Sequence, residues 1–321
     1  MWTAQRRPRI FVTQPVSETA LSRLRTAARV KVFADASRII PKRSLLNEVR
    51  RADILFCLLH DKIDRAVVTA NPQLRLIAAQ SITPSNIDVA TATERRIPVT
   101  VTAPITTEAT ADLNFGLMLA VARRVLEGDR TVRAGKFPGG QSAHLMGSYV
   151  WGKTIGLIGG GGLIGKAVSR RAHGFSMRVL YWTPRRKPES EEREAGLTYV
   201  PLEQLLRESD FVSLHSPLNA QTRHQIGARE LRLMKKTAFL INTARGPIVS
   251  DEALYRGLRE GWIAGAGLDD IEEEPAKQRD WKPANPLFGL DNVVITPMRR
   301  TTPKRRSARS ATSPRTRWRG C

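Results

Sequence analysis

Residues 153–168 form a glycine-rich stretch whose composition and spacing suit the binding of a dinucleotide. Gly160, Gly162 and Gly165 give the G-x-G-x-x-G pattern, in which glycines permit a tight turn, close approach of a pyrophosphate and close packing of a helix on a strand. A flexible linker would be polar on both sides, whereas here an apolar strand-like run precedes the glycines and a helical pattern follows them. We therefore predict a strand–turn–helix unit with phosphates at the helix N-terminus. Because four glycines are consecutive, a register that begins one residue earlier, at Gly159, also fits.

The segment after the next predicted strand favours NADP as the cofactor. In dinucleotide-binding sheets an acidic residue at this position binds the ribose hydroxyls of NAD. Counting on from Gly165, the position holds Thr183, which is not an acid. A hydroxyl followed by Arg185 and Arg186 suits the additional 2′-phosphate of NADP, because guanidinium groups pair with phosphate through two hydrogen bonds. A solvated basic loop is the alternative, and NAD stays open as the cofactor.

Two further segments carry groups that suit chemistry on a small carboxylic acid. Arg245 follows a buried apolar run and precedes a Gly-Pro pair, so we expect it at the carboxyl edge of a sheet. A cation there can bind a substrate carboxylate and polarise the adjacent carbonyl. An arginine that only caps the strand is the alternative. Residues 269–274 are rich in acids, one of which could hold a histidine in its charged form, although taken alone they are more typical of a solvated acidic turn.

Short apolar runs at regular spacing predict two parallel α/β units that position these residues. In the first half, strands are expected at 9–13, 30–33, 53–58 and 74–78, with amphipathic helices near 17–28, 43–51 and 62–70. In the second half, six strands are expected at 155–158, 178–182, 211–214, 238–242, 264–269 and 293–296. The predicted fold class is therefore α/β, with two doubly wound parallel-sheet domains, the second a Rossmann-type dinucleotide-binding domain. Ligands of such sheets lie beyond the carboxyl ends of the strands.

A long helical pattern occupies residues 106–133, between the two predicted sheets in the sequence. Thr106 or Thr107 can cap it, and Glu108 suits the positive end of the helix dipole. One face of the pattern carries Ala109, Leu113, Leu117, Ala120 and Arg124. We expect a helix that packs in the core or in a dimer.

The composition limits the class of protein. With 321 residues the chain can form two domains of ordinary size. We find no apolar run long enough for a membrane span or a signal peptide and expect a cytoplasmic protein with no membrane partner. Two cysteines, Cys57 and Cys321, cannot form a disulfide framework or a zinc site, and we expect no metal. The net charge of +22 would favour nucleic acid as a partner, but nine Lys and Arg residues and no acid lie in 298–321, so much of the excess belongs to one tail.

Together these motifs resemble the D-isomer-specific 2-hydroxyacid dehydrogenases, and within that family the glyoxylate/hydroxypyruvate reductases. The resemblance covers roughly residues 8–297. Besides the glycine-rich stretch, it rests on residues 86–89, 107–112, 215–218, 240–246, 267–269 and 272–275. It implies hydride transfer between NADP or NAD and C2 of a small 2-oxo acid such as glyoxylate or hydroxypyruvate. It also implies a homodimer formed through the cofactor domain.

The resemblance also implies a role for individual residues. Arg245 matches the substrate-binding arginine, and Glu274 matches the glutamate that pairs with the catalytic histidine. Asp269 matches the aspartate that holds the nicotinamide carboxamide. The other expected cofactor-binding residues are Gly160, Gly162, Leu163, Ile164 and Gly165 in the pyrophosphate loop, Thr183, Pro184 and Arg185 beside the ribose, and His215, Pro217, Thr243 and Ala244 at strand ends.

The chain departs from the family at Met298, where members have a histidine that protonates the carbonyl oxygen. A thioether cannot deliver a proton, and loss of a positioned general acid typically lowers a rate by about 10² to 10⁴. The family's amphipathic C-terminal helix is also not recognisable in residues 298–321. Because the resemblance stops within one residue, we hypothesise that this tail comes from a shift of reading frame or a truncation. A second departure is Pro84, in a loop expected to offer backbone N–H groups to the substrate carboxylate, since proline has none.

We therefore predict a substrate-binding, flavodoxin-like domain at 1–103, an NAD(P)-binding Rossmann domain at 104–297 and a basic, disordered tail at 298–321. The predicted function is NAD(P)-dependent reduction of a 2-oxo acid, impaired if Met298 is native. A different class stays open, a catalytically silent protein that binds NAD(P) and senses its state through a protein partner. Binding of nucleic acid by the tail is a third and weaker hypothesis, because no recognisable module surrounds its arginines.

Overall fold

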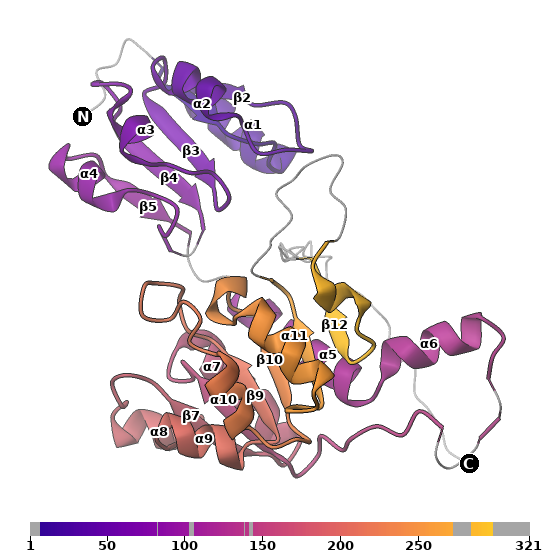
Figure 1. Cartoon of the computed structure of the whole chain (residues 1–321). Coiled ribbons are helices and arrows are strands. Elements are labelled where there is room, and N and C mark those ends of the chain that lie inside the picture. Colours follow the sequence, from indigo (N-terminus) through magenta and orange to yellow (C-terminus); the bar gives the residue numbers. More distant parts are fainter. Residues whose placement is uncertain are drawn as a thin grey trace, which may run out of the picture.

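The computed structural model describes residues 7–81, 83–102, 106–137, 139–140, 144–271 and 284–297. Within them the chain forms two β-sheets, each covered by its own helices (Figure 1). The paired strands of both sheets run parallel throughout the described residues. The predicted fold class, α/β with two doubly wound parallel-sheet domains, is confirmed. No helix in this part of the chain is long and apolar enough to cross a membrane.

The first sheet has five strands in the order β2-β1-β3-β4-β5. They are β1 (Arg9–Val12), β2 (Arg29–Val32), β3 (Ile54–Leu58), β4 (Leu76–Gln80) and β5 (Val99–Val101). Four helices lie between them, α1 (Glu18–Ala27), α2 (Lys42–Val49), α3 (Arg65–Thr69) and α4 (Val89–Glu94). The prediction missed β5 and placed β4 two residues early. Ser17, Asp64 and Asp88 start three of the helices, because each side chain accepts a hydrogen bond from the backbone N–H three residues on.

The second sheet has seven strands in the order β12-β11-β10-β9-β6-β7-β8. They are β6 (Thr154–Ile158), β7 (Arg178–Trp182), β8 (Thr198–Tyr199), β9 (Phe211–Leu214), β10 (Phe239–Asn242), β11 (Gly265–Leu268) and β12 (Val293–Ile295). Six of them match the prediction, and β8 adds a two-residue edge. The direction of chain progression reverses between β6 and β9, so the crevice for a ligand is expected at their carboxyl ends.

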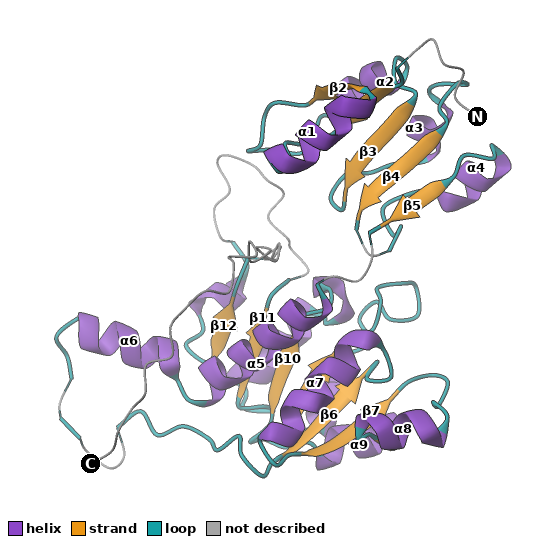
Figure 2. Ribbon diagram, turned by 180° about the vertical axis from the view of Figure 1, so that it is seen from behind, coloured by secondary structure: helices purple, strands orange, loops and turns teal. Residues whose placement is uncertain are grey.

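Helices cover both faces of the second sheet (Figure 2). They are α7 (Leu163–Gly174), α8 (Glu189–Ala195), α9 (Leu202–Glu208), α10 (Ala228–Leu233) and α11 (Asp251–Arg259), with 3-10 turns η1 (Gly246–Ile248) and η2 (Pro286–Gly289). Neighbouring residues of a strand point to opposite faces, so in β10 Leu240 packs in one hydrophobic cluster and Ile241 in another. This two-sided burial explains why the strands are almost wholly apolar.

The helical pattern at residues 106–133 forms two helices, α5 (Thr107–Ala122) and α6 (Val125–Arg133), instead of the single helix expected. Arg124 between them has a left-handed backbone (φ 52°), and its guanidinium binds Glu127 through two hydrogen bonds of 2.8 and 2.6 Å. On the predicted packing face of α5, Leu117 is buried, Leu113 and Ala120 are partly buried against the same hydrophobic cluster, and Arg124 is exposed. The buried residues of α5 are Ala111, Asn114, Phe115, Leu117, Met118, Val121 and Ala122, and it packs on α7, β10 and β11.

Candidate active site

The glycine-rich stretch forms the turn between β6 and α7, as predicted from its flanks. Gly159 has a left-handed backbone (φ 82°), and a Cβ there would lie 2.7 Å from the backbone carbon of His215. A Cβ at Gly165 would lie 2.3 Å from the carbonyl oxygen of Gly160. The strained turn therefore falls at Gly159, one residue before the first glycine of the predicted motif, while Gly160 and Gly165 bring strand and helix into contact.

The start of α7 fits the pyrophosphate of a dinucleotide. Gly162 is the N-cap residue, and no side chain caps the helix. A Cβ at Gly162 would meet only the Gly159 carbonyl oxygen, at 3.5 Å, so the backbone there is open to a ligand. The first N–H groups of a helix have no partner within it, and at this end they belong to Leu163, Ile164 and Gly165. These amides and the helix dipole suit a bound phosphate.

The ribose-side segment follows β7. The Thr183 hydroxyl donates to the carbonyl oxygen of Arg185 at 2.5 Å, which closes a short turn through Pro184. Arg185 is exposed, in agreement with a side chain that can meet a phosphate. Arg186, which the sequence also suggested for this purpose, binds Glu192 through two hydrogen bonds of 2.8 Å.

His215 follows β9 directly beside the glycine turn. Its Nε2 lies 3.0 Å from Ser213 Oγ, which accepts a hydrogen bond of 2.7 Å from the buried Asn114 side chain. Burial lowers the pKa of His215 to about 4, so the ring is neutral near pH 7. Pro217, another predicted cofactor residue, lies exposed two residues later in the same loop. A neutral imidazole here can bind and orient a ligand but is a poor proton donor.

The loop after β10 carries Thr243, Ala244 and Arg245. Asn242 is buried and shapes this loop, because its side chain accepts from the Ala244 N–H at 3.0 Å and donates to the Arg245 carbonyl oxygen at 2.9 Å. The Arg245 guanidinium is partly exposed and donates to the Ala244 carbonyl oxygen at 2.6 Å. Arg245 therefore stands at the carboxyl edge of the sheet, where the sequence placed it.

Asp269 follows the next strand, β11. Its side chain is buried and accepts a hydrogen bond of 2.6 Å from Thr296, directly after β12. Its backbone N–H donates to the carbonyl oxygen of Asn242 at 2.9 Å. The ends of three adjacent strands are thus connected by hydrogen bonds around one edge. Glu274 and Met298 lie outside the described residues.

In the first sheet, the loop after β4 contains Pro84, which the sequence analysis singled out. The Ser81 hydroxyl donates to the Thr83 carbonyl oxygen at 2.7 Å, and the Pro84 carbonyl accepts from the Ile87 N–H at 3.0 Å. Pro84 therefore stands in an ordered turn at the carboxyl end of its strand.

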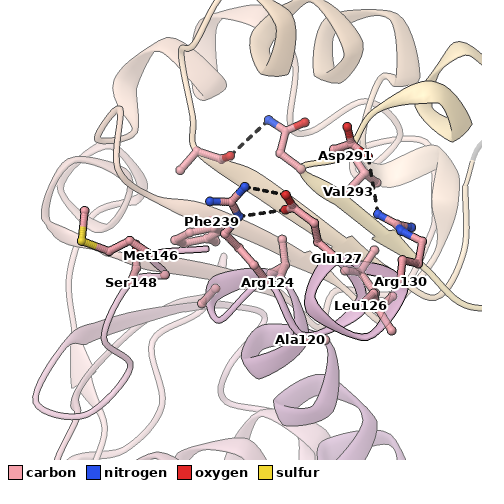
Figure 3. A pocket seen from close by; sticks show the side chains of 16 residues that line it. Ala120, Arg124, Leu126, Glu127, Arg130, Met146, Ser148, Phe239, Asp291 and Val293 are labelled. Atoms are coloured by element: carbon pink, nitrogen blue, oxygen red, sulfur yellow. Dashed lines mark hydrogen bonds and ion pairs between the residues drawn. The ribbon is translucent and has the colours of Figure 1, made fainter. Parts of the chain in front are cut away.

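A cavity of about 250 Å³ lies at the opposite edge of the second sheet (Figure 3). Its lining includes Phe239 and Val293, which begin β10 and β12, and the corner between α5 and α6. Arg130 reaches Asp291 across it at 3.4 Å. Because dinucleotides bind at carboxyl ends of such sheets, this cavity is separate from the dinucleotide site.

Comparison with known proteins agrees with this geometry. Residues 115–298 match the family model of the D-isomer specific 2-hydroxyacid dehydrogenase NAD binding domain. Glyoxylate reductases of Korarchaeum cryptofilum and Pyrococcus horikoshii are each 47% identical to the chain, over 91% of it and 86% of their own length. The crystal structure of the TT0316 protein from Thermus thermophilus superposes with a TM-score of 0.81 at 41% identity, covering 90% of this chain and 89% of that one.

The chain belongs to the D-isomer-specific 2-hydroxyacid dehydrogenases. The resemblance stated from the motifs is thereby confirmed. The family places the chain among oxidoreductases that act on CH–OH groups, with a domain that binds a nicotinamide dinucleotide. The open backbone at Gly162 and the uncapped start of α7 fit that group.

Sequence reasoning missed three polar residues of this dehydrogenase site. Asn114, Ser213 and Asn242 are buried, and their hydrogen bonds fix the loops that carry the predicted residues. Asn114 stood within an apolar helical pattern, and Ser213 and Asn242 stood within strands. A polar residue inside a buried element was the available signal, since burial of an amide or a hydroxyl normally requires a partner.

Proposed function

We propose that this dehydrogenase reduces glyoxylate or a closely related 2-oxo acid, with NADPH as the hydride donor. The observation that carries the proposal is the position of Arg245 at the carboxyl end of β10, held by Asn242 and one strand away from the buried Asp269. This supports a site in which a substrate carboxylate and the nicotinamide meet at one sheet edge. The glyoxylate reductases among its relatives supply the substrate class.

In this proposal Arg245 binds the substrate carboxylate and polarises the carbonyl. Its guanidinium now donates to the neighbouring Ala244 carbonyl, so substrate binding exchanges a neutral acceptor for a charged one. Asp269 would accept a hydrogen bond from the carboxamide of the nicotinamide. The Thr296 hydroxyl and the surrounding sheet hold the Asp269 carboxylate in place. The bound cofactor would supply the hydride. The residues that would hold it are the glycine turn and, around it, Thr183, Pro184, Arg185, His215, Pro217, Thr243 and Ala244.

The choice of NADP over NAD rests on charge. The end of β7 has Thr183 where an acid would bind the NAD ribose, and Arg185 is exposed next to it. A carboxylate there would repel a 2′-phosphate, whereas a hydroxyl and a guanidinium can both bond to it.

The rate of substrate turnover depends on the proton donor. In the family, the glutamate that Glu274 matches pairs with the catalytic histidine. This chain has Met298 at the position of that histidine, so Glu274 has no such partner there. We expect the chain as written to be slower than its relatives by about 10² to 10⁴. The same substitution favours a second candidate function, a protein that binds NADPH without turnover and reports its state to a protein partner.

The test is the oxidation of NADPH by glyoxylate and hydroxypyruvate, followed at high enzyme concentration in the wild type and in Arg245→Ala. The reductase proposal expects slow turnover that falls by a further factor of about 10² in the variant, as for loss of one charged group at a reacting carbonyl. Arg259→Ala, on the exposed end of α11, is the matched control and should leave the rate unchanged. Tight NADPH binding with no turnover of any 2-oxo acid favours the silent binder, and turnover indifferent to Arg245 rejects the assignment.

We further propose that the chain is a homodimer formed through α6 and the segment after it. No residue of α6 is buried, and helices of nine residues are marginal on their own. Seven of the eleven large exposed hydrophobic residues of the described chain lie between 125 and 151, namely Val125, Leu126, Val132, Phe137, Met146, Tyr149 and Trp151. Such a concentration of apolar surface is typical of an interface, and α6 extends away from the second sheet (Figure 1).

The domain boundary is proposed between residues 103 and 104. Helix α5 begins shortly after it and packs on β10 and β11, so the residues from 107 onward belong with the second sheet. The basic tail at 298–321 lies outside the described residues. The cytoplasmic location, and the hypothesis of a tail produced by a shifted reading frame, stay predictions.

A further inference from the structure

The side chain of Lys187 lies directly against the glycine turn. A Cβ added to Gly161 would be 2.8 Å from Lys187 Cγ and 2.9 Å from Lys187 Cε. The aliphatic chain thus crosses the turn where a Cβ at position 161 would displace it. Since Cε carries the ammonium group, this charge is held beside the dinucleotide turn, and the residue is only half-exposed.

A buried network fixes the backbone at Lys187. Its N–H donates to the Tyr181 hydroxyl oxygen at 2.9 Å, and that hydroxyl donates to Glu192 Oε1 at 2.6 Å. Tyr181 and Glu192 are both buried. The position of Lys187 therefore follows from the end of β7 and the start of α8, rather than from a free loop.

The same network occupies Arg186. Both of its hydrogen bonds to Glu192 are 2.8 Å long, and the guanidinium also lies over the ring of Tyr199, 5.5 Å from its centroid. A phosphate would have to displace a buried carboxylate to reach this guanidinium. Arg186 therefore stabilises the loop between β7 and α8 and does not offer its guanidinium to a phosphate.

Other charged residues of α7 and of the segment after β7 include Lys166, Arg185 and Lys187. The carboxylate of Glu191 binds Lys166 at 2.6 Å and also interacts with the charge of Lys187. This leaves a net positive charge where the chain passes from the glycine turn to the end of β7. In doubly wound sheets the adenosine ribose binds at the end of this second strand.

We infer that Lys187 binds the 2′-phosphate of NADP(H) together with Arg185, and that Arg186, Glu192 and Tyr181 are positioning residues for Lys187. The inference rests on the proposed use of NADPH and names the residue that produces the preference. Lysine acts as a compact point charge toward phosphate and needs no bidentate geometry, so its approach across Gly161 is sufficient.

The test is calorimetric binding of 2′,5′-ADP and 5′-AMP to the full chain, which needs no turnover and differs only in the 2′-phosphate. The wild type should prefer 2′,5′-ADP. Lys187→Ala should reduce that preference by roughly ten-fold, the value of one charge-assisted hydrogen bond, while Lys187→Arg keeps most of it. The matched control is Arg193→Ala, which removes an exposed charge on α8 and should leave the ratio unchanged.

Two results would overturn the inference, and they can be told apart. If Lys187→Ala keeps the wild-type ratio while Arg185→Ala removes it, Arg185 alone reads the phosphate and NADPH use stands. If the wild type itself binds both nucleotides equally, the proposed choice of NADPH fails and the inference fails with it. In a second variant, Gly161→Ala, the added Cβ should push Lys187 aside and lower the affinity for 2′,5′-ADP relative to that for 5′-AMP. This ratio should fall whether or not the affinity for 5′-AMP itself changes.

Discussion

The buried side-chain amide of Asn114, in α5, donates a hydrogen bond of 2.7 Å to Ser213 Oγ in β9, 99 positions further along the chain. The same nitrogen lies 3.3 Å from Thr243 Oγ1 after β10. Ser213 in turn contacts His215 Nε2. One amide on a helix therefore ties together two strand ends that line the proposed cofactor site.

We predict that Asn114→Ala lowers the free energy of unfolding by about 1–3 kcal/mol, because two buried hydroxyls lose their donor and a small cavity opens. Chemical denaturation measures the change. Asn47→Ala, at an exposed position of α2, is the control and should stay within about 0.5 kcal/mol of the wild type. An unchanged unfolding midpoint for Asn114→Ala would mean that the network contributes nothing to stability.

Met298→His should restore the proton donor. If the rest of the site is intact, kcat for glyoxylate should rise by about 10² to 10⁴, with a pH profile that shows a new ionisation. Met298→Gln is the control, since it adds polarity without a group that titrates near neutrality. No gain in the histidine variant, with NADPH binding preserved, would favour the silent binder over a reductase impaired at Met298.

His215 makes the protein less stable in mild acid. Its pKa is about 4 in the folded protein, against an ordinary value of 6.5, so below about pH 6.5 the unfolded chain takes up a proton that the folded chain refuses. Stability is therefore lost as the pH falls from about 6.5 toward 4. After allowance for partial exposure of the ring, His215→Gln should recover about 1 kcal/mol at pH 5 relative to pH 7.5.

Chemical denaturation at the two pH values gives this difference directly. His173→Gln replaces an exposed histidine of α7 and is the matched control. Equal pH dependence in His215→Gln and the wild type would show that the pKa of His215 is not lowered in the folded protein.

The homodimer is tested by Leu126→Glu, which places a charge in the exposed apolar segment of α6. Light scattering coupled to size exclusion should report a dimer for the wild type and a monomer for the variant. Val89→Glu is the control and should remain a dimer, because Val89 is an exposed apolar residue of α4, a helix that belongs with the first sheet. A monomeric wild type at micromolar concentration would reject the proposed interface.

The sequence by itself determined the elements that local chemistry dictates. Apolar runs with glycine and proline between them predicted six of the seven strands of the second sheet, because strands buried on both faces need continuous apolar residues. The glycine turn was also recognisable, because close approach and a left-handed backbone favour glycine. The sequence left its register open between Gly159 and Gly160, and the structure has the left-handed residue at Gly159. Arg245 and Asp269 could be placed at one edge because each follows a parallel strand.

Only the tertiary structure decided how the remaining side chains are used. Arg185, Arg186 and Lys187 look equivalent in the sequence. In the folded chain, however, Glu192 of α8 binds Arg186, and the side chain of Lys187 lies against Gly161. The break at Arg124 and the buried Asn114 likewise depend on what surrounds α5. Local sequence sets the propensity for strands and turns, whereas the partner of a charge or an amide depends on segments brought together by folding.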